Sequence, residues 1–550
     1  MATVVPHGRV PAAVMPHPAA ASLVALLHDR VVASGDRPAI VDGLASGAAV
    51  SDRRNRPEVP PPGFASLEAC ATGAAWTWLE LAAKALALAE ALEAAGVRRG
   101  DRLAHLGPHG PDWIVVDLAC LLAGVVHVAL HDDPGDRGSL AWLGLRGAIV
   151  SGGARRVAGV AGPCLDLTSG ACAAAVRPRA GDREALLEAI GRRARACDPD
   201  APCTIVLSSG TTGAPHGVLH SQRALATNAL AAADMFLDDP RDVRLAWLPM
   251  SHGLARTGDL YTALVRGGCL NVVRDRTRVL DACAALPPTV VLGVPAFFER
   301  LEAAARAGKI AHLRAALGGE VRVCVSGGAA LRRRTAEFFA AAGVPLVEGY
   351  GLAEAGPVVT LSNPRIARPG TVGPPLAGVE LRIDDHADGE LFVRTPSRAL
   401  GIVRPPREEE PRQPAAAAAI EPVPEWLPTG DRGAIDAAGH LRITGRLSER
   451  LVLSTGLKVP PAEVEQVLAE DPAVAQVCVV GDGLRWPVAL VVPEPGMVRG
   501  LVRRLRLPVF SRRGAVRHPR IVAWMARRIA RRQRRRPRSA WRSARRSRAA

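Results

Sequence analysis

A run of hydroxyl and glycine residues follows a stretch with strand character near the middle of the chain. Thr204–Leu207 is rich in β-branched residues and leads directly into S-S-G-T-T-G at positions 208–213. Small residues let backbone N–H groups approach an anion closely, and the hydroxyls supply further donors. The order of residues therefore predicts a phosphate-binding loop, although the G-x-x-x-x-G-K-[ST] pattern is absent from the sequence. A plain polar loop is the alternative.

Three later apolar segments, predicted as strands, each end in a turn that contains glycine. They are Thr289–Leu292, Val321–Val325 and Pro345–Glu348. In an open α/β sheet, ligands bind at the carboxyl ends of the strands. Taken one at a time, the polar residues near these turns have ordinary structural interpretations. A Glu such as Glu354 can begin a helix, an Asp such as Asp431 can stabilise a turn, and a His or Tyr can pack in a core.

The joint pattern resembles the adenylate-forming superfamily, which comprises acyl-CoA synthetases, luciferases and peptide-synthetase adenylation domains. The resemblance extends over residues 75–495, and within the superfamily the chain is most similar to AMP-forming long-chain fatty-acid CoA ligases. The segments that carry it, in chain order, are S-S-G-T-T-G-A-P-H-G-V (208–218), L-P-M-S-H (248–252), V-P-A-F-F-E-R-L (294–301), V-S-G-G-A-A-L (325–331), E-G-Y-G-L-A-E-A (348–355) and P-T-G-D (428–431).

The resemblance implies a role for each candidate residue. The implied catalytic residues are Thr211, Glu354, Arg446 and His252, with the His252 ring guarding the carboxylate of the acid. The implied Mg²⁺ ligands are Glu354 and Ser208. The implied nucleotide-binding residues are Ser208, Ser209, Gly210, Thr211, Thr212, Gly213 and His216 at the phosphates, and Gly327, Gly328, Ala329, Glu348, Gly349, Tyr350, Gly351, Leu352, Asp431 and Arg446 around adenine and ribose.

The implied reaction is the ATP-dependent activation of a long-chain fatty acid to an acyl-adenylate, followed by transfer to CoA. A carboxylate attacks an α-phosphate here, so two anions meet, and Mg²⁺ together with aligned donors must screen their charges. The implied cofactors are ATP, Mg²⁺ and CoA. One alternative is a ligase that loads the phosphopantetheine of a carrier protein, and another is a catalytically silent homologue.

Three positions depart from the family pattern. His216 replaces the usual Lys of the phosphate loop, and Ala353 replaces the Thr that usually precedes the Glu. The family's C-terminal L-P-x-T-x-x-G-K, whose Lys bridges the carboxylate and the α-phosphate, is missing because no Lys follows Lys458. We therefore expect weak or absent adenylation with nucleotide binding retained. The Arg-rich sequence after Trp524 suggests a shifted reading frame or degeneration of the C-terminus.

Alternating strand and helix patterns predict an α/β protein. We expect a large N-terminal domain of mostly parallel sheets covered by helices, with a smaller antiparallel part, and a small mobile α+β C-terminal domain. The predicted boundaries are residues 1–445 for the large AMP-binding domain, 446–524 for an incomplete C-terminal domain, and 525–550 for a disordered Arg-rich tail. Ile402–Glu425 is of low complexity and is predicted to be a surface insertion or linker.

The charge distribution and the cysteine content limit which cellular compartment and which partners can be expected. Residues 498–550 contain 20 Arg and no acidic residue, so the net charge of +17 resides in this segment, which could bind phosphates or nucleic acid non-specifically. No specific nucleic-acid partner is expected. The ten Cys form no C-x-x-C pair, and the N-terminus lacks a signal pattern. We expect a reduced, cytoplasmic protein, with peripheral contact to a membrane as an alternative.

Overall fold

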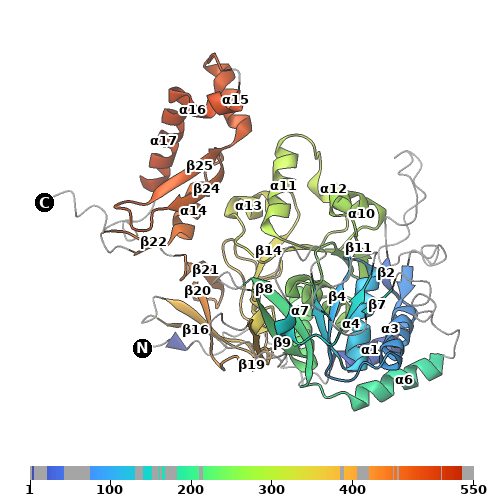
Figure 1. The fold of residues 1–550 in the computed structure, drawn as a ribbon. Coiled ribbons are helices and arrows are strands. Elements are labelled where there is room, and N and C mark those ends of the chain that lie inside the picture. Colours follow the sequence, from blue (N-terminus) through green and yellow to red (C-terminus); the bar gives the residue numbers. More distant parts are fainter. Residues whose placement is uncertain are drawn as a thin grey trace, which may run out of the picture.

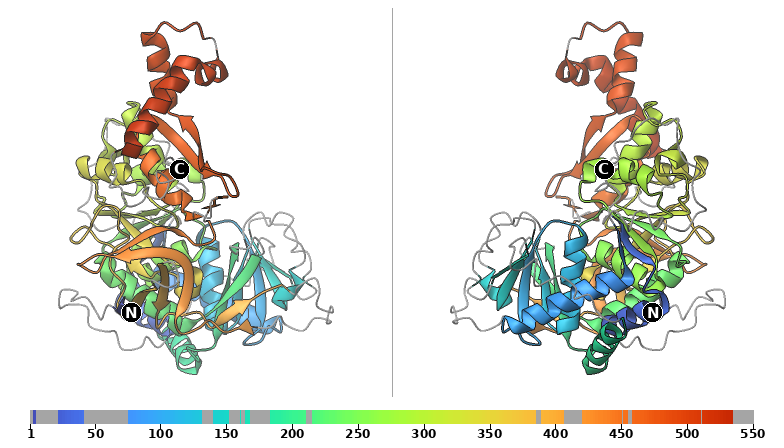
Figure 2. Two further views of the ribbon diagram at one scale, coloured as in Figure 1. Left: turned by 90° about the vertical axis from the view of Figure 1, so that its left-hand side faces the viewer. Right: turned by 90° about the vertical axis from the view of Figure 1, so that its right-hand side faces the viewer.

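The structure is a computed structural model. It describes residues 3–4, 22–41, 75–130, 140–151, 160, 164–167, 183–209, 215–384, 389–405, 420–449, 451–454, 458–509 and 511–534. A large N-terminal part contains three sheets, and a small C-terminal part rises from one end of it (Figures 1 and 2).

The first sheet has eight strands and carries the predicted phosphate loop. Its central strands β5, β4, β6 and β7 run parallel to one another and to β8, whereas β9, β18 and β19 extend the β8 edge in antiparallel fashion. The strands, in spatial order, are β19 (Ile420–Glu421), β18 (Gly401–Val403), β9 (Pro215–Ser221), β8 (Pro202–Ser209), β5 (Val126–Ala129), β4 (Arg102–Leu106), β6 (Gly147–Val150) and β7 (Cys164–Asp166).

The second eight-stranded sheet carries the three Gly-containing turns. Its six central strands are parallel, and an antiparallel strand closes each edge. Because β12, β13 and β14 are neighbours, their carboxyl ends lie side by side. The strands, in spatial order, are β15 (Thr360–Leu361), β14 (Leu346–Tyr350), β13 (Val323–Ser326), β12 (Val290–Gly293), β10 (Val243–Ala246), β11 (Cys269–Val272), β2 (Pro38–Val41) and β3 (Ala75–Thr77).

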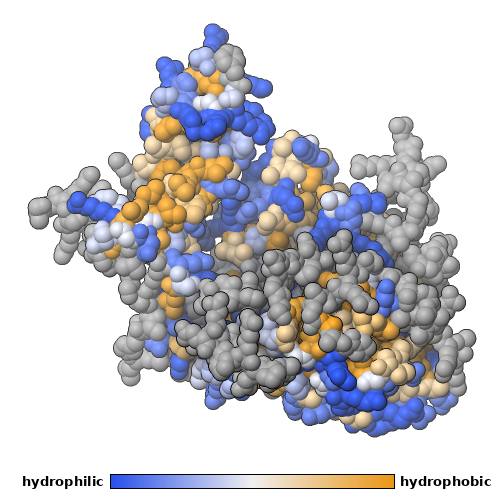
Figure 3. All heavy atoms as spheres, viewed as in Figure 1, coloured by the Kyte–Doolittle hydropathy of each residue, from blue (hydrophilic) through white to orange (hydrophobic). Residues whose placement is uncertain are grey.

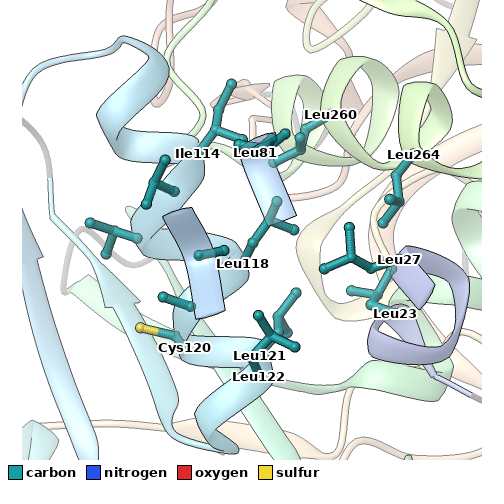
Figure 4. Close-up of a cluster of buried hydrophobic side chains, with 14 of the residues drawn as sticks. Leu23, Leu27, Leu81, Ile114, Leu118, Cys120, Leu121, Leu122, Leu260 and Leu264 are labelled. Carbon is teal, nitrogen blue, oxygen red and sulfur yellow. The ribbon is translucent and has the colours of Figure 1, made fainter. Parts of the chain in front are cut away.

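Apolar helices fill the space between these two sheets. They carry few charges on their buried faces, so leucine, isoleucine and alanine side chains interdigitate in one cluster that also includes residues of both sheets (Figure 4). The helices of this layer are α1 (Leu23–Ser34), α3 (Trp78–Ala94), α4 (Pro111–Ala123), α7 (Gln222–Phe236), the π-helical segment η2 (Arg256–Tyr261) and α9 (Thr262–Arg266). The charged helix α6 (Arg183–Ala196) packs against α1 and α4 with only Ile190 and Gly191 buried. The short helix α8 (Gly253–Ala255) leads into η2.

The opposite face of the second sheet is covered by a further group of helices, and the remaining short helical turns lie between elements. They are η1 (Ala141–Leu143), η3 (Arg276–Arg278), α10 (Val279–Ala285), α11 (Pro295–Arg306), α12 (Leu313–Ala316), α13 (Arg333–Ala341) and η4 (Ala353–Ala355). The third sheet is antiparallel, in the order β1 (Thr3–Val4), β16 (Glu380–Asp384), β17 (Glu390–Arg394), β20 (Leu427–Ile435) and β21 (Leu441–Arg446).

The C-terminal part combines helices with two antiparallel strand pairs. Alternate residues of β25 face outward, so Val488, Leu490 and Val492 remain exposed, and they contribute to the apolar surface over this hairpin in Figure 3. Its elements are β22 (Leu451–Val452), β23 (Lys458–Val459), α14 (Pro461–Ala469), β24 (Val474–Val480), β25 (Val488–Pro493), α15 (Pro495–Arg504), α16 (Arg512–Arg517) and α17 (Pro519–Arg534).

The predicted α/β fold class is confirmed, and one local expectation is wrong. Helix α17 runs to Arg534. Within this helix, Met525 is buried against Ala473 and Val474, and Arg528 Nε donates to Asp471 Oδ1 at 2.8 Å. The expectation of a disordered tail over residues 525–550 is therefore wrong for residues 525–534; residues 535–550 lie outside the described part.

The ends of the low-complexity region form strands β18 and β19, which pair with each other and extend the first sheet through β9. Residues 406–419 between these two strands lie outside the described residues. The expectation of a surface insertion or linker over Ile402–Glu425 stays a prediction. The boundary proposed at residue 446 falls on the last residue of β21, and the division into domains stays a prediction.

Candidate active site

The β8–β9 hairpin presents the predicted phosphate loop. Ser208 pairs across the ladder with His216, so both residues lie at the open end of the hairpin. His216 is buried, whereas Ser208 is half-buried. Gly210, Thr211, Thr212 and Gly213 lie outside the described residues, as does the Ser209 side chain. The return strand β9 was not predicted from the sequence, because residues 215–221 lack a run of β-branched residues.

His216 connects this hairpin to the second sheet. Its Nε2 lies 3.1 Å from Oε1 of Glu354, which belongs to η4 after strand β14. Burial raises the pKa of the Glu354 carboxyl, but the hydrogen bond from His216 and the charges of His216 and His220 outweigh it, so the pKa is lowered. Glu354 is thus a carboxylate at neutral pH, held at the edge of the loop.

The donor set suits a magnesium-nucleotide better than a free metal ion. Ser208 and Glu354 lie on either side of His216 and offer one hydroxyl and one carboxylate. No cluster of three His, Cys, Asp or Glu side chains that could hold a metal occurs among the described residues. Mg²⁺ commonly takes one or two protein carboxylates and completes its shell with phosphate oxygens and water. The residues present therefore fit Mg²⁺ that arrives with a nucleotide.

A second polar cluster forms where the second and third sheets meet. The Tyr350 hydroxyl at the end of β14 donates to Asp431 Oδ2 at 2.7 Å, and Arg446 Nε lies 3.1 Å from Asp431 Oδ1. The β20–β21 ladder places Asp431 directly opposite Arg446. Burial raises the pKa of Asp431, opposed by Tyr350 and Arg446, and burial also raises the pKa of Tyr350.

The glycine turns bring backbone close to this cluster. Gly328, in the turn after β13, has φ +80°, a conformation that side chains disfavour. A Cβ on Gly351 would lie 1.8 Å from the Pro357 carbonyl oxygen, so only glycine permits this approach of the chain to itself. A Cβ on Gly327 would lie 3.2 Å from Leu254 Cδ1, which places the segment after His252 against the same turn. His252 itself is exposed, directly before α8.

The remaining candidates border the same region. Glu348 is 9% exposed, and its Oε2 accepts a long hydrogen bond of 3.4 Å from the Leu331 N–H. Burial raises the pKa of Glu348 to about 7, so the acid is partly neutral at physiological pH. A Cβ on Gly349 would lie 3.0 Å from Leu361 Cδ1, and Ala329 and Leu352 occupy the turns after β13 and β14. The structure thus brings His216 to Glu354, and Tyr350 and Arg446 to Asp431, whereas His252 is placed near this region through the segment that follows it.

Sequence reasoning missed a buried polar network directly behind these turns. Asp117 of α4 pairs with the guanidinium of Arg256, accepts from the Tyr261 hydroxyl at 3.0 Å, and lies 2.8 Å from His127 Nδ1. All four residues are at most 1% exposed. Burial favours protonation of Asp117, but the adjacent Arg256 and His127 lower its pKa to about 2. The only signal in the sequence is the acid itself, which interrupts the apolar run of residues 113–130.

A small cavity lies between this network and the glycine turns. It has room for about one water molecule. Gly253, which follows His252, and Ala353, which precedes Glu354, belong to its wall, as do Arg256 and His220. The cavity therefore begins beside the two residues to which the family resemblance gives roles at the acid and the metal.

The site combines parallel strands that end in glycine turns with a carboxylate and a Tyr–Asp–Arg cluster beside those turns. This combination defines a nucleotide-dependent, acid-activating class of fold. The chain belongs to the family of AMP-binding enzymes, which it matches over residues 56–403; residues 463–531 match the C-terminal domain of that family. The resemblance stated from the motifs is thereby confirmed.

Individual relatives agree with this assignment. The chain is 31% identical over 487 residues to a long-chain-fatty-acid–CoA ligase of Mycobacterium bovis, with 78% of this chain and 79% of the relative covered. It is 32% identical over 450 residues to a Mycobacterium tuberculosis 3-[(3aS,4S,7aS)-7a-methyl-1,5-dioxo-octahydro-1H-inden-4-yl]propanoyl:CoA ligase, covering 76% and 84%. An anthranilate–CoA ligase in complex with anthranoyl-AMP shares the fold, with a TM-score of 0.68, 19% identity, and coverage of 94% and 91%.

None of the helices in the described ranges combines the length and apolar character that crossing a bilayer requires.

Proposed function

We propose that this chain is an acid–CoA ligase that uses Mg²⁺ and ATP to form an acyl-adenylate and then transfers the acyl group to the thiol of CoA. The observation that supports this most is the placement of Glu354, Tyr350, Asp431 and the glycine turns around one region at the ends of β13 and β14. Membership of the AMP-binding family and the names of its CoA-ligase relatives support the reaction class.

The proposed roles follow from the chemistry of each group. The hairpin residues Ser208 and His216 bind the phosphates, Glu354 holds the metal, and Asp431 accepts hydrogen bonds from the ribose hydroxyls. When bound, Mg²⁺ would neutralise charge on the phosphates. The acid's carboxylate oxygen forms a bond to the α-phosphorus, the bond to the bridging oxygen breaks, and pyrophosphate leaves. A thiolate then attacks the acyl carbon, and AMP departs with the bonding electrons.

The acid is proposed to be a hydrophobic carboxylic acid of the long-chain fatty type or a ring-bearing analogue. The relatives carry names for a fatty acid and for a dioxo-bicyclic propanoate at almost the same identity, so identity alone does not select between them. Loading of a carrier-protein phosphopantetheine in place of CoA is the second candidate acceptor, because both acceptors present the same thiol.

The chain's departures from the family pattern bear on the first half-reaction. His216 stands where the family has its phosphate-loop Lys. The family's C-terminal Lys has no equivalent, because no Lys follows Lys458. Both lysines would place positive charge on the anionic centre, so their loss slows adenylation more than thioester formation. We therefore propose that the full chain binds ATP and converts a supplied acyl-adenylate plus CoA faster than it makes the adenylate.

Two measurements on the full chain test the proposal. The first is the thermal shift with ATP and Mg²⁺, for the chain and for Asp431→Asn; loss of the ribose partner should weaken ATP binding about tenfold. Asp436→Asn, in the exposed turn after the same strand, is the matched control. The second compares the rate of pyrophosphate release from ATP and the acid with the rate of thioester formation from a supplied acyl-adenylate and CoA. Absence of any shift would contradict the nucleotide site, and pyrophosphate release as fast as thioester formation would contradict the impaired first step.

A further inference from the structure

Exposed apolar side chains gather on one hairpin of the C-terminal part. Among the described residues, twelve large hydrophobic side chains are exposed, and six of them lie between residues 480 and 492. Leu490, at 58%, is the most exposed of the twelve. A contiguous exposed apolar patch on a folded protein marks a place that a partner molecule or a membrane covers. The hairpin of β24 and β25 is therefore a candidate interaction surface.

The exposed side of this hairpin carries no charged side chain. It consists of three pairs that face each other across the ladder: Gln476 and Val492, Cys478 and Leu490, and Val480 and Val488. The other side of the hairpin is covered, because Val477 and Val491 pack on the cluster around Met525 of α17. We call the exposed side the apolar face.

Three helices that follow the hairpin carry a high density of positive charge. The segment from residue 495 to residue 534, which forms α15, α16 and α17, contains no Asp or Glu. Eleven arginines lie between residues 499 and 531, and ten of them are exposed. Figure 3 shows hydrophilic surface over α15 and α16 next to the apolar surface of the hairpin. Basic and apolar surfaces thus adjoin on one side of the C-terminal part.

These basic helices also expose apolar side chains between their arginines. Val516 of α16 is 41% exposed, and Val522 of α17 is 51% exposed. Helices of this kind bind at membrane surfaces, where the apolar side chains enter the headgroup boundary and the arginines reach the lipid phosphates. Arg528 has a different role, because its guanidinium pairs with Asp471 and lies over the Trp524 ring, 5.5 Å from the centroid.

The charge of the basic helices selects among the molecules that could cover the apolar face. A second copy of the chain would bring two sets of ten exposed arginines close together, and their repulsion opposes such a pair. A nucleic acid would match the charge, but its bases stack on aromatic rings and would leave the aliphatic face in water. An anionic membrane offers phosphates and hydrocarbon together, so it matches both surfaces.

We propose that the C-terminal part docks on an anionic lipid surface. The apolar face of the hairpin enters the headgroup boundary, and the exposed arginines of α15, α16 and α17 contact the lipid phosphates. Each arginine near such a surface strengthens binding about fivefold at low salt, and dissolved salt screens this gain. The inference does not depend on the proposed reaction, but it complements it, since a hydrophobic acid partitions into the bilayer on which the chain docks.

Co-sedimentation of the full chain with vesicles tests the proposal. Vesicles of phosphatidylglycerol and phosphatidylcholine in equal amounts are compared with vesicles of phosphatidylcholine alone. At an ionic strength of about 0.05 M we expect the anionic vesicles to bind about tenfold more tightly, and at about 0.5 M most of this difference should disappear. Equal binding to both kinds of vesicle at the lower ionic strength would overturn the inference.

A first pair of variants tests the apolar face. Leu490→Glu places a charge in the middle of this face and should weaken binding to the anionic vesicles about tenfold, because the side chain no longer gains from leaving water. Val32→Glu, at an exposed position of α1, makes the same change in charge and should leave binding unaltered. Unchanged binding in Leu490→Glu would give the face to another occupant, a second copy or the large part of the same chain, and would overturn the inference.

A second pair of variants tests the basic helices. Arg512→Gln with Arg513→Gln removes two exposed arginines of α16 and should weaken vesicle binding about tenfold. Arg192→Gln with Arg195→Gln removes two exposed arginines of α6 and should have little effect. Losses of equal size in both double variants would show that net charge alone matters, and would contradict docking through the C-terminal part. Single-stranded RNA that binds more tightly than the anionic vesicles, without any loss in Leu490→Glu, would also overturn the inference.

Discussion

His216 and Glu354 form a contact of 3.1 Å at the place where we propose that the nucleotide phosphates and their metal bind. A ligand must therefore compete with this pair for both side chains. A lysine ammonium would offer a phosphate a compact positive charge at this position.

His216→Lys is expected to tighten ATP binding about fivefold, because a lysine ammonium places a full positive charge against the phosphates. Calorimetric titration with ATP and Mg²⁺ measures the effect. His312→Lys, at an exposed position, provides the same change in net charge away from the site and should leave the affinity unaltered. A gain of the same size in both variants would show that the effect comes from net charge alone.

Glu348 gives a prediction about pH and stability. Burial raises its pKa to about 7, above the value of about 4.3 in an unfolded chain. Between those two values the unfolded chain loses a proton that the folded chain keeps, so the free energy of unfolding falls as pH rises. The full fall amounts to about 4 kcal/mol and ends once the pH exceeds the folded pKa.

Glu348→Gln keeps an oxygen for the Leu331 N–H and removes the titration. The fall in melting temperature between pH 5 and pH 8 should therefore be smaller in the variant, by about 3 °C for a chain of this size. Differential scanning calorimetry at unit intervals of pH measures it. Glu320→Gln, at an exposed position, serves as the control and should follow the unaltered protein. Identical profiles for all three proteins would refute the assignment of this pH dependence to Glu348.

At the scale of elements, the sequence predicts regular strands and helices well and predicts pairing poorly. The strands predicted over Thr289–Leu292, Val321–Val325 and Pro345–Glu348 occur as β12, β13 and β14, with bounds shifted by one or two residues. Strand β9 was missed because P-H-G-V-L-H-S lacks a run of β-branched residues, and its pairing with β8 comes from residues across the loop. The strand conformation of β9 therefore depends on its pairing with β8 and not on the local β propensity of its residues.

The buried network joins α4, β4, β5 and η2, and Asp117 is its only acid. Removing that charge leaves Arg256 buried without a counter-ion, since both residues are at most 1% exposed. Loss of one partner of a buried ion pair typically costs 3–5 kcal/mol, whereas replacing the pair with apolar groups costs far less. Asp117→Asn is therefore expected to destabilise the protein by about 4 kcal/mol, and Asp117→Asn with Arg256→Met should recover part of that loss.

Chemical denaturation monitored by tryptophan fluorescence measures these differences. Asp112→Asn provides a control on the same helix, because Asp112 lies exposed in its first turn and should contribute well under 1 kcal/mol. If Asp117→Asn were no more destabilising than Asp112→Asn, the network would not be an ion pair that the four elements depend on.

At the scale of the whole molecule, the motifs predicted a nucleotide site, and the structure shows which contacts connect them. Nothing in the spacing of Tyr350 and Asp431 predicts that a hydroxyl and a carboxylate 81 residues apart meet at 2.7 Å. The cavity wall was equally hidden, because Arg256 and Thr257 resemble ordinary residues of a surface helix until the fold buries them. Composition also misled: the Arg-rich segment after Trp524 supports helix α17, whose apolar side packs on the C-terminal sheet.

The contact between the two parts of the molecule yields the last prediction. Two arginines at the start of α13 donate to backbone carbonyls of the C-terminal part: Arg332 Nη2 to Ala475 O at 2.7 Å, and Arg334 Nη1 to Asp471 O at 3.3 Å. Arg333 between them instead pairs with Glu337 of its own helix at 2.8 Å. Of these three arginines, the outer two therefore contact the C-terminal part.

Arg332→Ala combined with Arg334→Ala should release the C-terminal part, because two hydrogen bonds of about 0.5–1.5 kcal/mol each are lost. We expect limited proteolysis between residues 446 and 461 to become about tenfold faster and the radius of gyration in X-ray scattering to increase, with ATP binding retained. Arg333→Ala removes an arginine from the same turn without touching the contact, and it should cleave at the unaltered rate. Equal rates in both variants would mean that other contacts fix the orientation, and the two carbonyls of the C-terminal part would then have no share in setting it.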